Sequence, residues 1–202
     1  MKARRVRHLD PAAPLADSLQ RIVETRLDEL CAFMPRAADP RRVQVLHDMR
    51  IASKRLRYIL EVGEGLFGPY AKQAGKRTKE LQDLLGEIHD CDVTFPRITA
   101  LAEEAREADL EAILAASGQA TAVAPEILAA APHHDAHAGL ASMTTSLLAR
   151  RALLFARFEE MWLQLEREGF AARLRFAVTE RPLSHDENGK LPGSLVRSDV
   201  PQ

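Results

Sequence analysis

The stretch that decides the fold runs from Val43 to Val62 and reads VQVLHDMRIASKRLRYILEV. Its apolar residues recur at three and four positions, which is the spacing of an amphipathic helix. At 100° per residue, a second set of side chains falls within about 80° on a neighbouring side. This basic row is spaced i, i+3, i+7, i+10 and is roughly 15 Å long; it consists of His47, Arg50, Lys54 and Arg57.

A row of like charges on one helix is costly unless something anionic neutralises it, because the charges repel one another. Acidic residues scarcely interrupt the row, since Asp48 lies off it and Glu61 is one turn beyond. The spacing therefore favours a surface that binds a polyanion. The alternative is an ordinary solvated basic face.

The helical period extends over most of the chain, and prolines and glycines divide it. We expect helices over about 15–33, 43–62, 70–90, 92–116 and 140–168, with Pro96 in the first turn of the fourth rather than in an interior. Residues 117–139 predict a connector with room for one short helix. The last helix has an apolar stripe formed by Leu140, Met143, Leu147, Leu148, Leu154, Phe155, Phe158, Met161, Trp162 and Leu165.

No alternating run is long enough for a strand, so the sequence predicts an all-α fold of antiparallel helical hairpins that form bundle units. Residues 182–202 are rich in turn residues and have no period, which indicates a disordered tail. No apolar run approaches the roughly 18 residues of a membrane span. Cys31 and Cys91 are the only cysteines, which excludes a disulfide framework and favours a reduced, cytoplasmic protein.

The formal net charge of −1 hides a strong asymmetry. The segments 1–8, 41–58 and 72–79 together hold 14 of the 28 Lys and Arg in 34 residues, with one acidic residue among them. Concentrated basic segments in an acidic body predict a local anion site. Lys72, Lys76 and Lys79 share one face, which fits either an extension of the anion site or an ordinary solvated surface. Gln82 and His89 lie beside an apolar stripe, where they can point into a groove. We expect the N-terminal KARRVR to be a solvated tail; the alternative is an arm that grips the anion.

The segments LHDMRIASKRLRYILE (Leu46–Glu61) and KELQDLLGEIHDCDV (Lys79–Val93) resemble the conserved histidine α-helical domain, or CHAD, family. The hallmark helix of that family reads H-x-x-R-x-x-x-K-R-x-R, which His47, Arg50, Lys54, Arg55 and Arg57 match here. The resemblance is dense over about 41–95 and looser from Met1 to about Arg175. It implies a CHAD-like helical domain over 1–176.

The resemblance implies binding of inorganic polyphosphate in a basic channel between helical bundles, without a catalytic centre, a metal or a cofactor. The matched motif implies that His47, Arg50, Lys54, Arg55 and Arg57 bind the ligand, and from the helix faces we expect Lys72, Lys76, Lys79 and His89 to join them. Only one copy of the motif is clear, so the second half of the domain is degenerate or truncated. A homodimer could supply the missing wall of the channel, and polyphosphate granules are an expected location.

Physical chemistry agrees with a polyphosphate ligand. A rigid row of cations matches a linear chain of phosphates, because Arg supplies forked donors and Lys a point charge. Protonated His47 would add a charge, so binding is expected to strengthen as the pH falls. Tyr58 is the only aromatic residue among these bases, which disfavours single-stranded nucleic acid.

Two other functions remain open from the residues. The pairs His47-Asp48 and His89-Asp90 resemble the adjacent metal ligands of HD-type phosphohydrolases, although neighbouring Arg and Lys would repel a divalent cation. The protein could also be a helical scaffold that recognises an acidic partner. The run HHDAH, with His133, His134 and His137, could bind a metal with Asp135, but an incidental surface run is the simpler interpretation.

Overall fold

We describe residues 2–180 in a computed structural model of the chain. The elements are α1 (Leu15–Cys31), η1 (Arg36–Ala38, a 3₁₀ turn), α2 (Val43–Val62), α3 (Pro69–Ser117), α4 (Pro125–Ala129), α5 (Ala136–Arg167) and α6 (Phe170–Thr179). Residues 2–180 contain no strand, so the all-α prediction is confirmed over this range. None of the helices described is both long and apolar enough to cross a membrane. The predicted tail at 182–202 lies outside the described residues.

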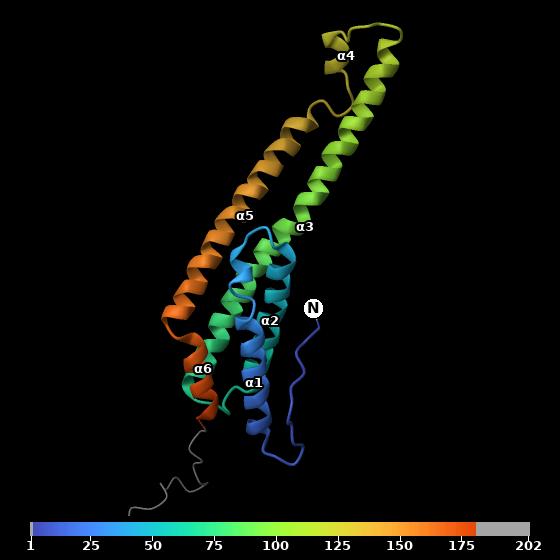
Figure 1. Cartoon of the computed structure of the whole chain (residues 1–202). Helices are drawn as coiled ribbons and strands as arrows, with labels where there is room; N and C mark the ends of the chain where they lie inside the picture. The colour runs from blue at the N-terminus through green and yellow to red at the C-terminus, as the bar shows by residue number, and fades with distance from the viewer. Residues whose placement is uncertain (1, 181–202) are drawn as a thin grey trace, which may run out of the picture.

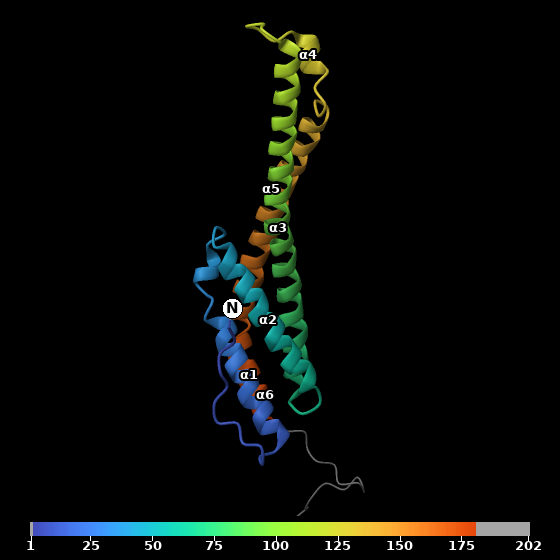
Figure 2. The same cartoon turned by 90° about the vertical axis from the view of Figure 1, so that its right-hand side faces the viewer.

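The molecule is elongated and has a wide body and a narrow arm (Figure 1). The body contains α1, α2, α6 and the adjoining halves of α3 and α5, whereas the arm consists of the remaining halves of α3 and α5 with α4 at the tip. In Figure 2, turned by 90°, α5 lies behind α3 and crosses it along the arm. Successive long helices are antiparallel, as the predicted hairpins require.

The hydrophobic core lies in the body. Leu27 of α1, Leu56 of α2 and Leu85 of α3 are completely or almost completely buried, and Phe158 of α5 and Leu174 of α6 complete the same cluster. Gly169 ends α5 in a left-handed conformation with φ of 66°, which turns the chain directly into α6. The core therefore holds α2 rigidly between α1 and α3.

The prediction of two separate helices over 70–90 and 92–116 is wrong, because α3 is one helix of 49 residues with Pro96 inside it. An interior proline costs about 3 kcal/mol, since it removes one backbone hydrogen bond. Cys91 before Pro96 and Ile98 after it are both buried on the α5 side of α3. A break at Pro96 would separate these contacts, so continuous packing against α5 outweighs the local cost.

The arm is an antiparallel helix pair with heptad-like spacing. Inward-facing residues of α3 alternate steps of four and three, the spacing of a coiled-coil seam; they are Cys91, Phe95, Ile98, Ala102, Ala105, Asp109 and Ala112. Near the tip, buried Asp109 accepts hydrogen bonds from the backbone N–H of His133 at 2.8 Å and from the ring nitrogens of His133 and His137 at 3.1 and 2.7 Å. These two histidines therefore hold the connector onto the arm.

The predicted apolar stripe of the 140–168 helix is only partly correct. Phe158, Trp162 and Leu165 are buried in the body, as expected. Met143 and Leu148, by contrast, are exposed on the arm. The reason is that α3 alone faces this half of α5, and one neighbouring helix covers a narrower stripe than a bundle does.

Candidate anion-binding site

The basic row on α2 meets α3 at its His47 end. Nδ1 of His47 lies 3.3 Å from Nδ1 of His89, and the two ring centroids are 4.5 Å apart. Three residues further along α2, Nε of Arg50 approaches Gly86, where an added Cβ would lie 3.6 Å away. A Cβ at Gly86 would make ordinary van der Waals contact there, so the distance shows that the guanidinium of Arg50 packs against α3 and not that the position requires glycine.

These two contacts fix the register of the antiparallel pair. Continuing in the same steps places Gln82 opposite Lys54, and Lys79 opposite Arg57. The spacing of the basic row on α2 is thus repeated in reverse on α3. We call these eight residues the α2–α3 seam: His47, Arg50, Lys54 and Arg57 on α2, and Lys79, Gln82, Gly86 and His89 on α3.

Buried polar atoms without a hydrogen-bond partner gather in the seam. Within residues 2–180 there are five such side-chain atoms, and three of them are Nε of Arg50, Nε of Arg57 and Oε1 of Gln82. Nε of Arg57 lies 3.3 Å from a carboxylate oxygen of Glu61, close enough for an ion pair but not a well-aligned hydrogen bond. An unsatisfied buried polar group costs about 1–3 kcal/mol. These three atoms are enclosed by the protein, so a ligand would contact the partly exposed remainder of Arg50 and Arg57 and not their Nε atoms.

Tyr58 supports the exposed side of the row. The guanidinium carbon of Arg57 lies 4.6 Å from the centroid of the Tyr58 ring, and Nζ of Lys54 lies 5.6 Å from the same centroid. Such cation–π contacts limit the freedom of both cations. A ligand at the seam therefore has less side-chain entropy to remove.

The three lysines of the early α3 helix continue the seam toward the end of α2. Lys72, Lys76 and Lys79 line a pocket of about 180 Å³ together with Leu60, Glu61 and Glu64 of the α2 end. Lys72 pairs with Glu64 at 2.5 Å, and Lys79 pairs with Asp83 at 2.7 Å. Both pairs are largely exposed, so each contributes little to stability and its lysine can exchange the carboxylate for another anion.

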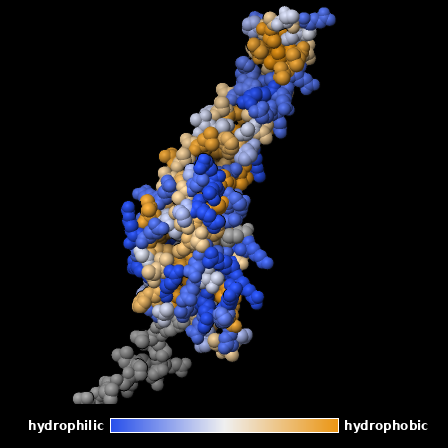
Figure 3. Space-filling model, in the orientation of Figure 1, coloured by the Kyte–Doolittle hydropathy of each residue, from blue (hydrophilic) through white to orange (hydrophobic). Residues whose placement is uncertain are grey.

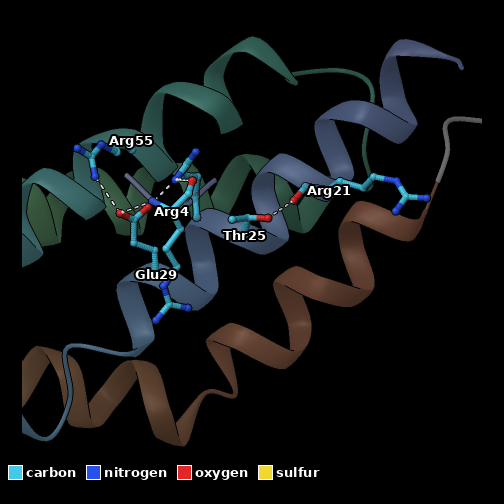
Figure 4. A network of polar contacts seen from close by, with 6 residues as sticks. Arg4, Arg21, Thr25, Glu29 and Arg55 are labelled. Carbon is cyan, nitrogen blue, oxygen red and sulfur yellow. Dashed lines mark hydrogen bonds and ion pairs between the residues drawn. The ribbon is translucent and has the colours of Figure 1, made fainter. Parts of the chain in front are cut away.

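Arg55 does not join the row. It points toward α1, where its Nη1 lies 2.8 Å from Oε1 of Glu29 (Figure 4). The Glu29 side chain is almost fully buried, and its other oxygen accepts from Arg26 at 2.6 Å. Arg55 therefore fixes α2 against α1 instead of facing the seam. The lone acidic residue in a buried helix stripe was the sequence signal for this pair, and pattern reasoning missed it.

The N-terminal segment is not a free solvated tail over the residues described. The backbone N–H of Arg4 donates to Oε1 of Glu29 at 3.4 Å, and the backbone carbonyl of Arg4 accepts from Arg26 at 3.0 Å (Figure 4). Val6 is half-buried. The expectation of a solvated tail is thus correct for the side chains, since Lys2, Arg4, Arg5 and Arg7 are exposed, but Glu29 and Arg26 hold the backbone of Arg4 along α1.

The seam has an unusual balance of charge at its histidine end. Burial lowers the pKa of His89 below its ordinary value, and the nearby His47 and Arg50 lower it further, while Asp90 and Asp92 act in the opposite sense. The free protein therefore disfavours a proton on His89. A bound anion would reverse the repulsion and favour the protonated ring.

Other parts of the structure fit an anion or a metal less well. A larger pocket of about 470 Å³ between α3 and α5 is lined by more carboxylates than guanidinium groups. Residues 2–180 contain no group of three or more His, Cys, Asp or Glu placed to hold a metal ion. In the run at 133–137, His133 and His137 form hydrogen bonds with Asp109 and not with Asp135.

Comparison with known protein families agrees with this geometry. The family model described as CHAD domain matches residues 2–99, which include α1, α2 and the seam half of α3. This part of the chain belongs to the CHAD domain family. The match thus covers the whole α2–α3 seam and reaches residue 99, just after Pro96. No curated protein and no solved structure matches the chain.

Proposed function

We propose that the protein binds inorganic polyphosphate along the α2–α3 seam and does not hydrolyse it. The observation that carries the proposal is the row of bases that α2 places along the seam, in which His47, Arg50 and Arg57 are half-buried and Lys54 is exposed. Arg and Lys donate hydrogen bonds and cannot accept them, so the row favours a ligand that presents anionic oxygens. Membership of residues 2–99 in the CHAD family supports the same ligand class.

The dimensions of the seam favour a linear polyanion over a single phosphate. The row from His47 to Arg57 spans roughly 15 Å along the helix axis. A single phosphate can contact two or three of these side chains, whereas a chain of phosphates can follow all of them. Lys72, Lys76 and Lys79 extend the same track past the end of α2.

We assign direct roles to His47, Arg50, Lys54, Arg57, Lys72, Lys76, Lys79 and His89. Arg55 has an indirect role, because its contact with Glu29 positions the basic helix. If the protein also locates to polyphosphate granules in the cell, the same seam is the part that attaches it.

A metal-dependent phosphohydrolase is the alternative that shares the substrate. It would use the His47-Asp48 or His89-Asp90 pair as metal ligands. The two histidines instead contact each other, and Arg50 stands beside them. Cations at this distance oppose a divalent metal, which favours binding without hydrolysis. A scaffold for an acidic protein partner would use the same charges, and the match of residues 2–99 to the CHAD domain favours polyphosphate over it.

The experiment that tests the proposal is a set of binding titrations with polyphosphate, DNA and RNA at several salt concentrations. Polyphosphate should bind most tightly, and its affinity should fall steeply with the logarithm of the salt concentration, by analogy with phosphate contacts in nucleic-acid complexes. A preference for DNA or RNA over polyphosphate would overturn the assignment of the ligand. Polyphosphate affinity that is flat with salt would overturn the electrostatic account.

A further inference from the structure

The outer surface of α5 on the arm carries no charge over an unusual length. Residues 136–149 include no Asp, Glu, Lys or Arg, and their only ionisable side chain is the inward-facing His137. Large apolar side chains nevertheless face outward on this half of the helix: Met143 is 54% exposed, Leu148 is 46% exposed and Leu153, slightly further on, is 74% exposed. A solvated helix normally carries charged residues on such a face.

The other helix of the same arm shows the contrast. Over the comparable stretch 97–111, α3 has two Arg and five Asp or Glu residues. Both helices are equally far from the body, so their difference does not come from position along the arm. In Figure 3 blue, hydrophilic atoms gather over part of the arm, while pale and orange atoms run beside them. One side of the arm is thus suited to water and the other to a protein surface.

We propose that this uncharged outer face of α5 is a self-association surface that pairs with α5 of a second copy of the chain. The face is defined by Ala138, Ala141, Ser142, Thr145, Leu148, Ala149, Ala152, Leu153 and Ala156. Small residues recur there at steps of three, four and seven, which lets two helix axes approach closely, and the two leucines fill the space between them. The proposal does not depend on the polyphosphate ligand.

Charge argues for a second copy rather than another occupant. None of the face residues can form an ion pair with a charged peptide; the exposed Arg150 and Arg157 lie beside the face at its body end. Acidic α3 lies beside it, which disfavours an anionic membrane surface. When two α5 faces meet, by contrast, the two α3 helices lie on the outside of the pair, where their negative charges are separated by α5 of each copy.

The size of the face sets the expected strength. Residues 136–156 span about 30 Å along the helix axis. One helix face of this length buries less than the roughly 800 Å² per partner of a standard stable interface. The dimer should therefore be weak and dependent on protein concentration, and it should persist in high salt because apolar contacts hold it together.

Sedimentation equilibrium of the full chain over about 1 to 200 µM tests this inference. The wild type should shift toward dimer as concentration rises, at both low and high salt. Ala149→Arg places a charge at the centre of the face and should raise the dissociation constant at least about tenfold. Ala100→Arg is the matched control, since Ala100 is exposed on α3, and it should dimerise like the wild type.

Each outcome decides between specific interfaces. A wild type that stays monomeric at the highest concentration would overturn the proposal. A dimer that dissociates in high salt would also overturn it and would point to pairing of acidic α3 with the basic seam of another copy. Unchanged dimerisation of Ala149→Arg, with normal helicity by circular dichroism, would place the interface elsewhere. None of these results bears on polyphosphate affinity, which is measured separately.

Discussion

His47 on α2 and His89 on α3 face each other with their Nδ1 atoms 3.3 Å apart. The two helices thus bring two titratable rings to the end of a row of permanent cations. In the free protein this contact opposes protonation, because burial and the charges of His47 and Arg50 lower the pKa of His89. An anion at the same place has the opposite effect. We therefore expect the pair to couple ligand binding to proton uptake.

Polyphosphate affinity should rise as the pH falls, and His89 is expected to carry part of this dependence. The pKa of His89 is depressed in the free protein and should increase when polyphosphate binds, so binding takes up a proton between these two values. The gain in polyphosphate affinity should appear as the pH falls below about 6.5, the ordinary pKa of a histidine side chain. Isothermal titration calorimetry in buffers of different ionisation enthalpy measures the proton uptake directly.

The matched variant is His89→Gln, which keeps a polar side chain but cannot titrate. It should bind polyphosphate with a flatter pH profile and take up fewer protons. A profile for His89→Gln that is as steep as that of the wild type would assign the pH dependence to other groups.

Buried Glu29 should be important for stability although it lies outside the seam. Glu29→Gln removes the charge that Arg26 and Arg55 share and leaves both guanidinium groups poorly compensated. Breaking one partner of a buried pair typically costs about 3–5 kcal/mol, and we expect the lower end because Arg55 is partly exposed. Urea denaturation measures the free energy of unfolding.

The neighbouring Asp28 provides the control for Glu29. Asp28 also pairs with an arginine, Arg175, but both side chains are about half exposed. Asp28→Asn should therefore cost less than about 1 kcal/mol. Equal losses of unfolding free energy in Glu29→Gln and Asp28→Asn would show that burial of the Glu29 ion pairs adds no stability over an exposed pair.

Asp109 should hold the tip of the arm in an acid-sensitive way. Burial opposes ionisation of this carboxyl, but hydrogen bonds from His133 and His137 outweigh burial and lower its pKa. A carboxyl whose pKa is lower in the folded state than in the unfolded state stabilises the fold. This stability is present at pH values above the unfolded-state pKa of about 3.9, and it is lost as the pH falls through the folded-state pKa. Hydrogen exchange of residues 125–137 should therefore be slow near neutral pH and faster in Asp109→Asn.

The body of the protein should be unaffected by the same change. Asp109→Asn should leave exchange in α2 as slow as in the wild type, because α2 packs in the core and not at the tip. Faster exchange throughout the body would mean that the arm and body unfold as one unit, contrary to a local role for Asp109.

Phosphate release is not expected from polyphosphate, with or without added Mg²⁺ or Mn²⁺. Arg and Lys that clamp phosphates can stabilise a transition state, so charge alone does not exclude catalysis. The seam, however, offers no activated nucleophile, and its cations oppose a metal near His47. A colorimetric phosphate assay tests this expectation. Release above background that disappears in His89→Ala would promote the hydrolase alternative.

Sequence reasoning could predict α2 well because its polar and apolar residues obey one helical period. The same reasoning could not place Pro96, since the cost of an interior proline is local and the packing that offsets it comes from α5, which is distant in sequence. The direction of the Arg55 side chain could not be predicted either. Its position in the sequence fits the basic motif, and only the fold shows that its guanidinium pairs with buried Glu29.

Only some of the seam residues on α3 could be predicted from the sequence. Lys79 and His89 are recognisable in the sequence as charged or titratable residues. The contact of Arg50 with α3 at Gly86 is visible only in the fold, because it depends on how close the two helices lie. The repeated spacing at Lys79, Gln82, Gly86 and His89 is a signal in the sequence, but its meaning depends on the register of α2 against α3.

The most direct test of the central claim is the polyphosphate affinity of the double variant Arg50→Glu/Arg57→Glu, measured by titration calorimetry at constant salt. Reversal of both seam guanidinium groups should weaken binding at least about 100-fold, or by about 2.7 kcal/mol, with helicity and melting temperature nearly unchanged. Arg106→Glu, which reverses an exposed charge on the arm, should bind like the wild type. Equal losses from the double variant and Arg106→Glu would contradict a defined site, and wild-type affinity in the double variant would contradict the role of the α2–α3 seam.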